Sequence, residues 1–130
     1  MSATILVVDD SATTRSLVAA YLADWQDVEV VEAASGFEAL RVLPARRVDL
    51  IVTDINMPDI NGLELISFVR ANPNYRRIPV IIITTENSDE DRKRGLDLGA
   101  SDYLVKPFGA ADLRRAVDAA LGRGQETVGP

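Results

Sequence analysis

Five short apolar runs, rich in β-branched residues, alternate along the chain with longer segments of mixed character. The runs ILVV, LIVT and VIIIT are continuously apolar, which is typical of strands covered on both faces in a parallel sheet. The pattern therefore predicts five strands, at residues 4–8, 28–33, 50–53, 80–84 and 103–105.

The segments between these runs show the spacing of amphipathic helices. In the last one, Leu113, Val117 and Leu121 recur at i, i+4 and i+8 and share one face. The other apolar faces are formed by Leu17, Tyr21, Leu22 and Trp25, by Phe37, Leu40 and Leu43, and by Leu63, Ile66 and Val69. Residues 88–98 offer no apolar face before Leu96, so we expect this helix to be loosely docked.

Strands that alternate with helices through short connections indicate right-handed βα units and an open parallel α/β sheet. A chain of 130 residues fits one domain with a single core. We predict that this domain spans residues 1–122. Residues 123–130 are too few for a second domain and are expected to form a short flexible tail.

Composition excludes several functions. The chain has no Cys and no His, which removes thiol chemistry, histidine-ligated zinc and Ser-His-Asp hydrolysis. The net charge of −6 opposes binding to nucleic acid or anionic lipid, since both need clustered Lys and Arg. No run approaches the ~20 apolar residues that cross a bilayer, and the first residues do not resemble a signal peptide. We therefore expect a cytoplasmic protein that does not bind membranes.

Polar residues follow four of the predicted strands. Asp9 and Asp10 come after the first strand and Asp54 after the third, while Thr84 ends the fourth and Lys106 follows the fifth. In a parallel sheet these positions share one edge, the edge at which open α/β sheets bind ligands. If the first and third strands are neighbours, three carboxylates converge and need a cation. An oxygen-only ligand set suits a hard ion such as Mg²⁺, which also binds phosphate.

Four motifs in order, VVDDS, TDINMP followed by NG, IIITTE and YLVKPF, resemble those of the response-regulator receiver domain. The resemblance covers roughly residues 3–122. It implies a flavodoxin-like (βα)5 sheet with strand order 2-1-3-4-5 and helices on both faces. It also implies a phospho-acceptor signalling protein, one that catalyses only its own phosphorylation and dephosphorylation.

By this resemblance, Asp54 is the phospho-acceptor. Asp9, Asp10, Asp54 and the backbone carbonyl of Asn56 form an Mg²⁺ site, in which Mn²⁺ can substitute. Asp10 is implied as a direct ligand, and Asp9 as one that acts mostly through bound water. Asn56 and Glu86 are expected to border the path of the hydrolytic water and so to tune dephosphorylation.

The same resemblance assigns a switch. Thr84 and Lys106 match the hydroxyl and the lysine that contact the phosphoryl group, the bond between Lys106 and Pro107 matches a cis peptide, and Tyr103 matches the aromatic switch. A compact ammonium group suits a single phosphoryl oxygen in a crowded pocket. Phosphorylation is expected to draw Thr84 inward and to open space into which Tyr103 turns. This changes the face formed by the fourth predicted helix, the fifth strand and the fifth helix.

The phosphoryl donor must be another molecule, because this chain has no His. The resemblance implies a histidine kinase as donor and a stand-alone regulator, with chemotaxis as the first pathway to consider. Residues 92–94, Arg114 and Arg115 suggest a locally basic output face, so we expect a protein target with an acidic surface. The chain is expected to be a monomer or a phosphorylation-dependent dimer.

Simpler interpretations stay open at this stage. Asp9 and Asp10 could cap the first helix, because Asp is a good N-cap. Asp54 could be a turn residue before Pro58, and Tyr103 could serve only in packing. A flavin-binding protein of the same architecture would place hydroxyls after the first strand, and a haloacid-dehalogenase-type phosphohydrolase would place a D-x-D motif there. A receiver excised from a larger regulator is the third alternative.

Overall fold

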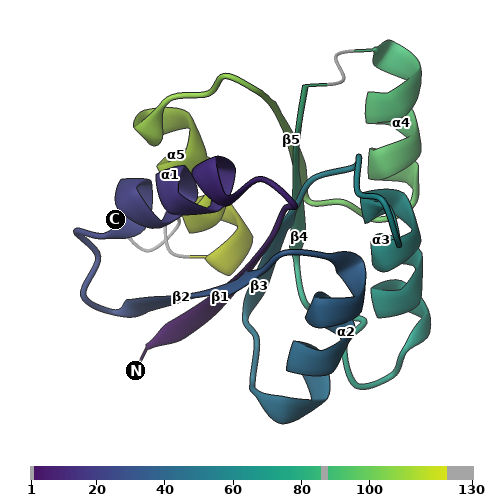
Figure 1. Cartoon of the computed structure of the whole chain (residues 1–130), viewed down its shortest axis with the longest axis horizontal. Helices are drawn as coiled ribbons and strands as arrows, with labels where there is room; N and C mark the ends of the chain where they lie inside the picture. Colours follow the sequence, from purple (N-terminus) through teal and green to yellow (C-terminus); the bar gives the residue numbers. More distant parts are fainter. Residues whose placement is uncertain (1, 86–87, 123–130) are drawn as a thin grey trace, which may run out of the picture.

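The computed structural model describes residues 2–85 and 88–122 and shows a parallel five-stranded sheet between two layers of helices (Figure 1). The strands are β1 (Ala3–Val8), β2 (Val28–Ala33), β3 (Leu50–Thr53), β4 (Val80–Thr84) and β5 (Asp102–Val105). The helices are α1 (Ala12–Leu22), α2 (Gly36–Ala45), α3 (Gly62–Ala71), α4 (Asp89–Asp97) and α5 (Ala110–Leu121). The strand order is β2-β1-β3-β4-β5, which confirms the predicted flavodoxin-like topology.

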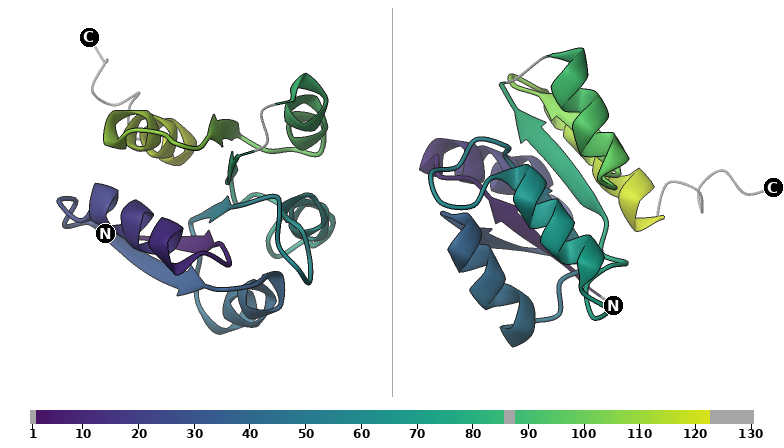
Figure 2. Two further views of the ribbon diagram at one scale, coloured as in Figure 1. Left: turned by 45° about the horizontal axis from the view of Figure 1, so that its top comes forward. Right: turned by 90° about the vertical axis from the view of Figure 1, so that its right-hand side faces the viewer.

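Alternate side chains of each strand point to opposite faces of the sheet, and each face has its own helices. Along β1, Ile5 and Val7 belong to the core under α1 and α5, whereas Leu6 and Val8 belong to the core under α2 and α3. All four side chains are fully buried. Figure 2 shows α1 and α5 together on one side of the sheet and the other helices on the opposite side. Burial on both faces explains why the strand runs are continuously apolar.

Two residues of the predicted helix faces lie outside the core. Leu17 and Phe37, which the pattern places in the core, are 40% and 59% exposed. In α1 the buried residues are Val18, one position after Leu17, and Leu22, which the pattern predicted. The first residue of α2, Gly36, packs so closely against the β3–α3 connection that an added Cβ would lie 2.7 Å from the Cβ of Ile60. Because Gly36 faces inward, Phe37 faces solvent.

The helix α4 buries one small residue against the sheet. Within α4 only Gly95 is buried, and an added Cβ there would lie 2.6 Å from the Cδ1 of Ile82. The helix begins at Ser88, whose Oγ accepts a hydrogen bond from the N–H of Asp91 over 3.0 Å. Since its charged side chains bury little apolar area, α4 is loosely docked, as its sequence predicts.

None of the helices within residues 2–85 and 88–122 has the length and apolar character needed to cross a bilayer. The predicted C-terminal tail, residues 123–130, lies outside the described part of the chain.

Candidate functional site

Asp9 and Asp54 follow the carboxyl ends of two strands that are paired with each other. Val8, the last residue of β1, is in register with Thr53, the last residue of β3. The N–H of Asp54 donates to the carbonyl of Val8 over 3.0 Å. Parallel pairing thus ends both strands at the same edge, and it brings together the acids that come next in the sequence.

Three carboxylates meet at this edge. One oxygen from each of Asp9, Asp10 and Asp54 lies within 4.8 Å of the others. Asp9 is fully buried and Asp54 is 7% exposed, whereas Asp10 is exposed. Like charges this close favour a bound cation. Hard oxygen donors with one ligand open to water are the set that Mg²⁺ prefers, so the residues present fit the predicted ion.

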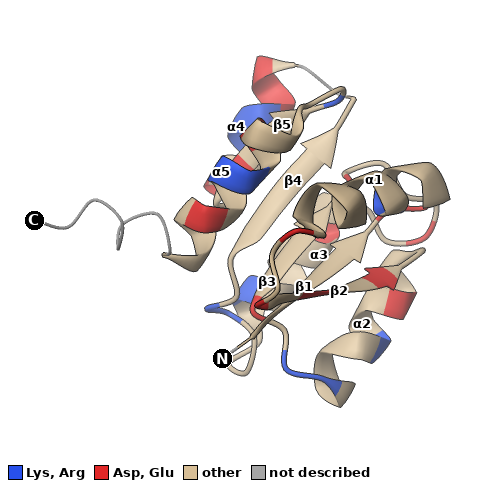
Figure 3. Cartoon of the chain, turned by 90° about the vertical axis from the view of Figure 1, so that its left-hand side faces the viewer, with Lys and Arg blue, Asp and Glu red and all other residues tan. Residues whose placement is uncertain are grey.

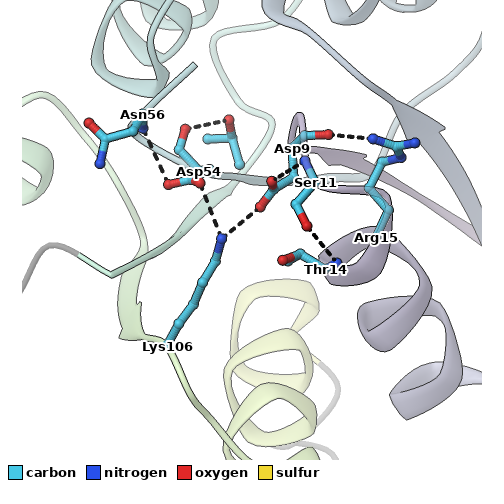
Figure 4. A network of polar contacts seen from close by, with 8 residues as sticks. Asp9, Ser11, Thr14, Arg15, Asp54, Asn56 and Lys106 are labelled. Atoms are coloured by element: carbon cyan, nitrogen blue, oxygen red, sulfur yellow. Dashed lines mark hydrogen bonds and ion pairs between the residues drawn. The ribbon is translucent and has the colours of Figure 1, made fainter. Parts of the chain in front are cut away.

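Lys106 supplies the positive charge of the site. Its Nζ lies 2.9 Å from the Oδ2 of Asp9 and 3.1 Å from the Oδ2 of Asp54, between the two carboxylates (Figure 4). Burial acts to lower the pKa of Lys106, but the hydrogen bonds and charges of Asp9 and Asp54 outweigh it and raise the pKa. The ammonium group therefore stays charged at neutral pH. The bond from Lys106 to Pro107 is cis, as the resemblance implied.

Ser11, and not the acidic pair, caps the first helix. Its Oγ accepts from the N–H of Thr14 over 3.3 Å, and its own N–H donates to the Oδ1 of Asp9 over 2.8 Å. Arg15 donates from Nη1 to the backbone carbonyl of Asp9 over 2.7 Å and from Nε to Glu32 over 3.0 Å. The capping interpretation of the acids is therefore wrong. Arg15 holds the backbone of Asp9 in place, a role that no local pattern indicated.

The connection from β3 to α3 is tied both to Asp54 and to α2. The N–H of Asn56 donates to the Oδ1 of Asp54 over 3.2 Å. The two carboxylate oxygens of Asp59 accept from the N–H groups of Gly36 and Phe37 over 3.2 and 2.9 Å. The hydrogen bond from Phe37 is the main cause that lowers the pKa of Asp59. Sequence reasoning missed Asp59, because its partners lie 23 and 22 residues away along the chain.

The end of this connection packs directly against the backbone of Asp54. An added Cβ at Gly62 would overlap the carbonyl oxygen of Asp54, and the N–H of Gly62 donates to Ile55 over 2.9 Å. Asn61 caps α3 in a capping box with Glu64. Only a residue without a side chain fits at the start of α3, so the close approach of α3 fixes the backbone of Asp54.

Thr84 and Tyr103 lie on β4 and β5, the two strands beyond β3 in the sheet. Thr84, at the end of β4, is fully buried, and its carbonyl accepts from the N–H of Lys106 over 2.7 Å. Tyr103 in β5 is 3% exposed, and the guanidinium carbon of Arg92 in α4 lies 5.0 Å from the centre of its ring. Tyr103 is thus buried under α4.

Two other predicted groups differ from expectation or cannot be placed. Glu86 lies outside the described residues. Arg114 donates from Nε to the carbonyl of Tyr21 over 2.7 Å, and its Nη2 lies 3.4 Å from Asp24. Arg114 therefore binds to the end of α1 and is not displayed on the output face, whereas the Arg115 side chain is 75% exposed.

Comparison with known proteins agrees with this arrangement. The family described as "Response regulator receiver domain" matches residues 5–118. The chain is 39% identical over 121 residues to a chemotaxis protein CheY homolog of Campylobacter jejuni, covering 92% of this chain and 93% of that protein. The solved structure of chemotaxis protein CheY4 of Vibrio cholerae superposes with a TM-score of 0.86 at 38% identity, over 93% of this chain and 100% of that chain.

A similar sequence also occurs as part of a longer protein. A probable cyclic di-GMP phosphodiesterase of Vibrio cholerae is 38% identical over 88% of this chain, but the match covers 25% of that protein. The sheet order, the three acids at its edge and the lysine between them all agree with the family match. The chain thus belongs to the response regulator receiver domain family, a family of signalling domains.

Proposed function

We propose that this chain signals by accepting a phosphoryl group on Asp54 from a histidine kinase. The observation that carries this proposal is the Lys106 ammonium group, which lies between the carboxylates of Asp54 and Asp9. Asp54 is buried enough to be shielded from bulk water, and it has a cation beside it. An acid in this position is suited to attack a phosphorus atom and then to hold the charge that it gains.

In the proposed step, an Oδ of Asp54 forms a bond to phosphorus. The P–N bond of the phosphohistidine breaks, and its electron pair leaves with the imidazole of the kinase. Lys106 stays charged and holds one phosphoryl oxygen, while the N–H of Asn56 keeps the carboxylate oriented. Asp9, Asp10, Asp54 and the carbonyl of Asn56 would hold Mg²⁺, which neutralises charge on the phosphoryl oxygens.

Acetyl phosphate tests this step without a kinase. Incubation with Mg²⁺ is expected to raise the intact mass by one phosphoryl group, and the Asp54→Asn variant should show no such increase. Asp97→Asn, which removes an exposed carboxylate from α4, serves as the matched control and should be labelled like the wild type. Labelling of Asp54→Asn at the wild-type rate would contradict the assignment.

We further propose that the signal leaves the site through Thr84 and Tyr103. A phosphoryl group on Asp54 attracts the hydroxyl of Thr84, which moves the end of β4 relative to α4. The Tyr103 ring, stacked on Arg92, passes this shift to the face formed by α4, β5 and α5. A hydrogen bond to a charged group contributes about 1.5 to 3 kcal/mol, enough to change a two-state population roughly ten- to a hundredfold.

We propose that the target of this face is a protein with an acidic surface. We also propose that phosphoryl transfer to this chain takes place in the cytoplasm. Arg115 is the better probe of an acidic target, because Arg114 is bound to α1. Arg115→Glu should weaken capture of the target by the phosphorylated form without changing phosphorylation. Unchanged capture would count against an acidic target. Size-exclusion chromatography of the phosphorylated form separates a monomer from a phosphorylation-dependent dimer.

Asn56 is proposed to control the lifetime of the phosphoryl group, together with Glu86. The Asn56 side chain is exposed beside Asp54, where it borders the approach of water. Asn56→Leu should therefore slow the loss of radiolabelled phosphate. A decay rate equal to that of the wild type would refute this role.

A further inference from the structure

A groove of about 490 Å³ lies at the edge of the sheet opposite to the acidic cluster. It is bounded by the α2–β3 connection, residues 46–49, and by the α3–β4 connection, residues 72–79. Both connections lead into the amino ends of their strands, whereas Asp9 and Asp54 follow the carboxyl ends. The length of a five-residue strand, about 15 Å, therefore separates the groove from the phospho-acceptor.

Arginine side chains dominate the charge of this groove. Arg46 and Arg47 line it from one connection and Arg77 from the other, and Arg76 precedes Arg77 on the same connection. Figure 3 shows the blue segments of the two connections at the lower edge of the sheet. Arg46 and Arg47 have carboxylate partners at 2.6 and 3.3 Å. Within residues 2–85 and 88–122, the guanidinium groups of Arg76 and Arg77 have no ion-pair partner.

The positive charge here opposes the net charge of −6 of the whole chain. One acidic residue, Asp49, lines the groove beside the three arginines. Its Oδ2 accepts from the N–H of Thr4 over 2.8 Å and its Oδ1 faces Arg47, so this carboxylate is already engaged. Arg77 is therefore available to an anion from outside the chain. A carboxylate suits it, because arginine binds carboxylates through two parallel hydrogen bonds.

The floor of the groove is apolar. Pro73, Ile78 and Pro79 line it with surface open to a ligand, whereas Leu43 and Val48, 3% and 7% exposed, offer almost none. A small inorganic anion would use the arginines and leave this floor unused. An acidic polypeptide segment that also carries an apolar side chain would use both, as ligand sites with an apolar floor and a few placed charges do.

We propose that this groove binds an acidic segment of a partner protein, with a carboxylate on Arg77 and an apolar side chain against Pro73, Ile78 and Pro79. Binding here does not depend on the chemistry of Asp54, which lies at the other edge. The groove thus gives the chain a second protein contact, separate from the face formed by α4, β5 and α5.

Fluorescence anisotropy tests the proposal with a fluorescein-labelled peptide of alternating Glu and Leu. The full chain should bind this peptide, and Arg77→Glu should weaken binding about tenfold or more. Arg41→Glu makes the same charge change on the exposed surface of α2, outside the groove lining, and should bind like the wild type. Arg77→Glu must still be phosphorylated by acetyl phosphate, which shows that it is folded.

Three results would overturn the proposal. Equal weakening of peptide binding by Arg41→Glu and Arg77→Glu would show that the peptide responds only to the overall charge of the chain. Inorganic tripolyphosphate that binds as tightly as the peptide, with no loss when Ser replaces Leu in the peptide, would assign the groove to a small anion. Concentration-dependent self-association that Arg77→Glu abolishes would assign it to a second copy of the chain.

Discussion

The Nζ of Lys106 lies 3.1 Å from the Oδ2 of Asp54, although the two residues follow strands that are not neighbours. Asp54 follows β3 and Lys106 follows β5, and β4 stands between them in the sheet. The long lysine side chain therefore reaches across the end of β4, where Thr84 is buried. The backbone N–H of Lys106 also donates to the carbonyl of Thr84 over 2.7 Å, so Lys106 is bonded at the ends of β1, β3 and β4.

Lys106→Met keeps the length of the side chain and removes its charge. It leaves the carboxylates of Asp9 and Asp54 without their cation, so the free energy of unfolding should fall by about 1 to 3 kcal/mol in the presence of EDTA. Urea denaturation measures this change. Mg²⁺ should restore part of it, because an ion that binds the folded chain stabilises that state. Lys93→Met on the exposed surface of α4 is the control and should change little.

Asp10→Asn should act in the opposite direction. Its carboxylate is exposed and lies within 4.8 Å of two others, so removing its charge relieves repulsion. Without divalent ions the variant should be more stable than the wild type, by about 0.5 to 1 kcal/mol. Thermal unfolding without Mg²⁺ measures the stability gained by removing the charge, and thermal unfolding with Mg²⁺ measures the stabilisation by the ion. The increase in Tm caused by Mg²⁺ should be smaller in the variant. An undiminished Mg²⁺ effect would remove Asp10 from the ligand set.

Local pattern was sufficient for the strands and for the acids that follow them. A run such as VIIIT predicts a buried strand, because a strand buried on both faces carries apolar residues at every position. That Asp9 and Asp54 meet is a different kind of inference. It depends on β1 and β3 being neighbours, and periodicity does not give strand order; the family resemblance supplied it.

Residues that act through distant partners were beyond local pattern. Arg15 and Asp59 bond to groups on other elements, Glu32 and the start of α2, and neither contact leaves a periodic signal. Phe37 shows the reverse case, since its helical spacing suggested burial. The close contact between Gly36 and Ile60 turned Phe37 outward, and a contact 24 residues apart in the sequence cannot be read from one helix.

Arg70→Ala should loosen the C-terminal end of α4. The Arg70 guanidinium donates to the carbonyl of Gly99 over 3.2 and 2.7 Å, and to the carbonyls of Arg76 and Ile78 over 3.1 and 2.7 Å. Burial lowers the pKa of Arg70, and these carbonyls hold its charge in place. Losing these hydrogen bonds should lower the free energy of unfolding, measured by urea denaturation, by about 2 to 4 kcal/mol. Amide exchange should accelerate around Gly99, whereas Arg41→Ala should leave both measurements unchanged.

Asp59→Ala tests whether Asp59 stabilises α2 only, or also positions the β3–α3 connection beside Asp54. The carboxylate of Asp59 caps α2 from the β3–α3 connection, so its loss should cost about 1 kcal/mol at neutral pH. The pKa of Asp59 is lower in the folded chain than its ordinary 3.8. An acid with a lowered pKa stabilises the fold above its ordinary pKa, and this contribution is lost as pH falls through the folded value. The difference from wild type in urea denaturation should therefore be full at neutral pH and should shrink below pH 3.8.

Ser35→Ala is the matched control for this experiment. The Oγ of Ser35 also caps α2, accepting from the N–H of Glu38 over 3.2 Å, but it does not touch the β3–α3 connection. Both variants should lose a similar amount of stability. Only Asp59→Ala releases the connection that carries Asn56, so only this variant should need more Mg²⁺ to reach the wild-type rate of labelling by acetyl phosphate. The same Mg²⁺ requirement in both variants would mean that Asp59 stabilises α2 and does nothing to hold the acceptor site.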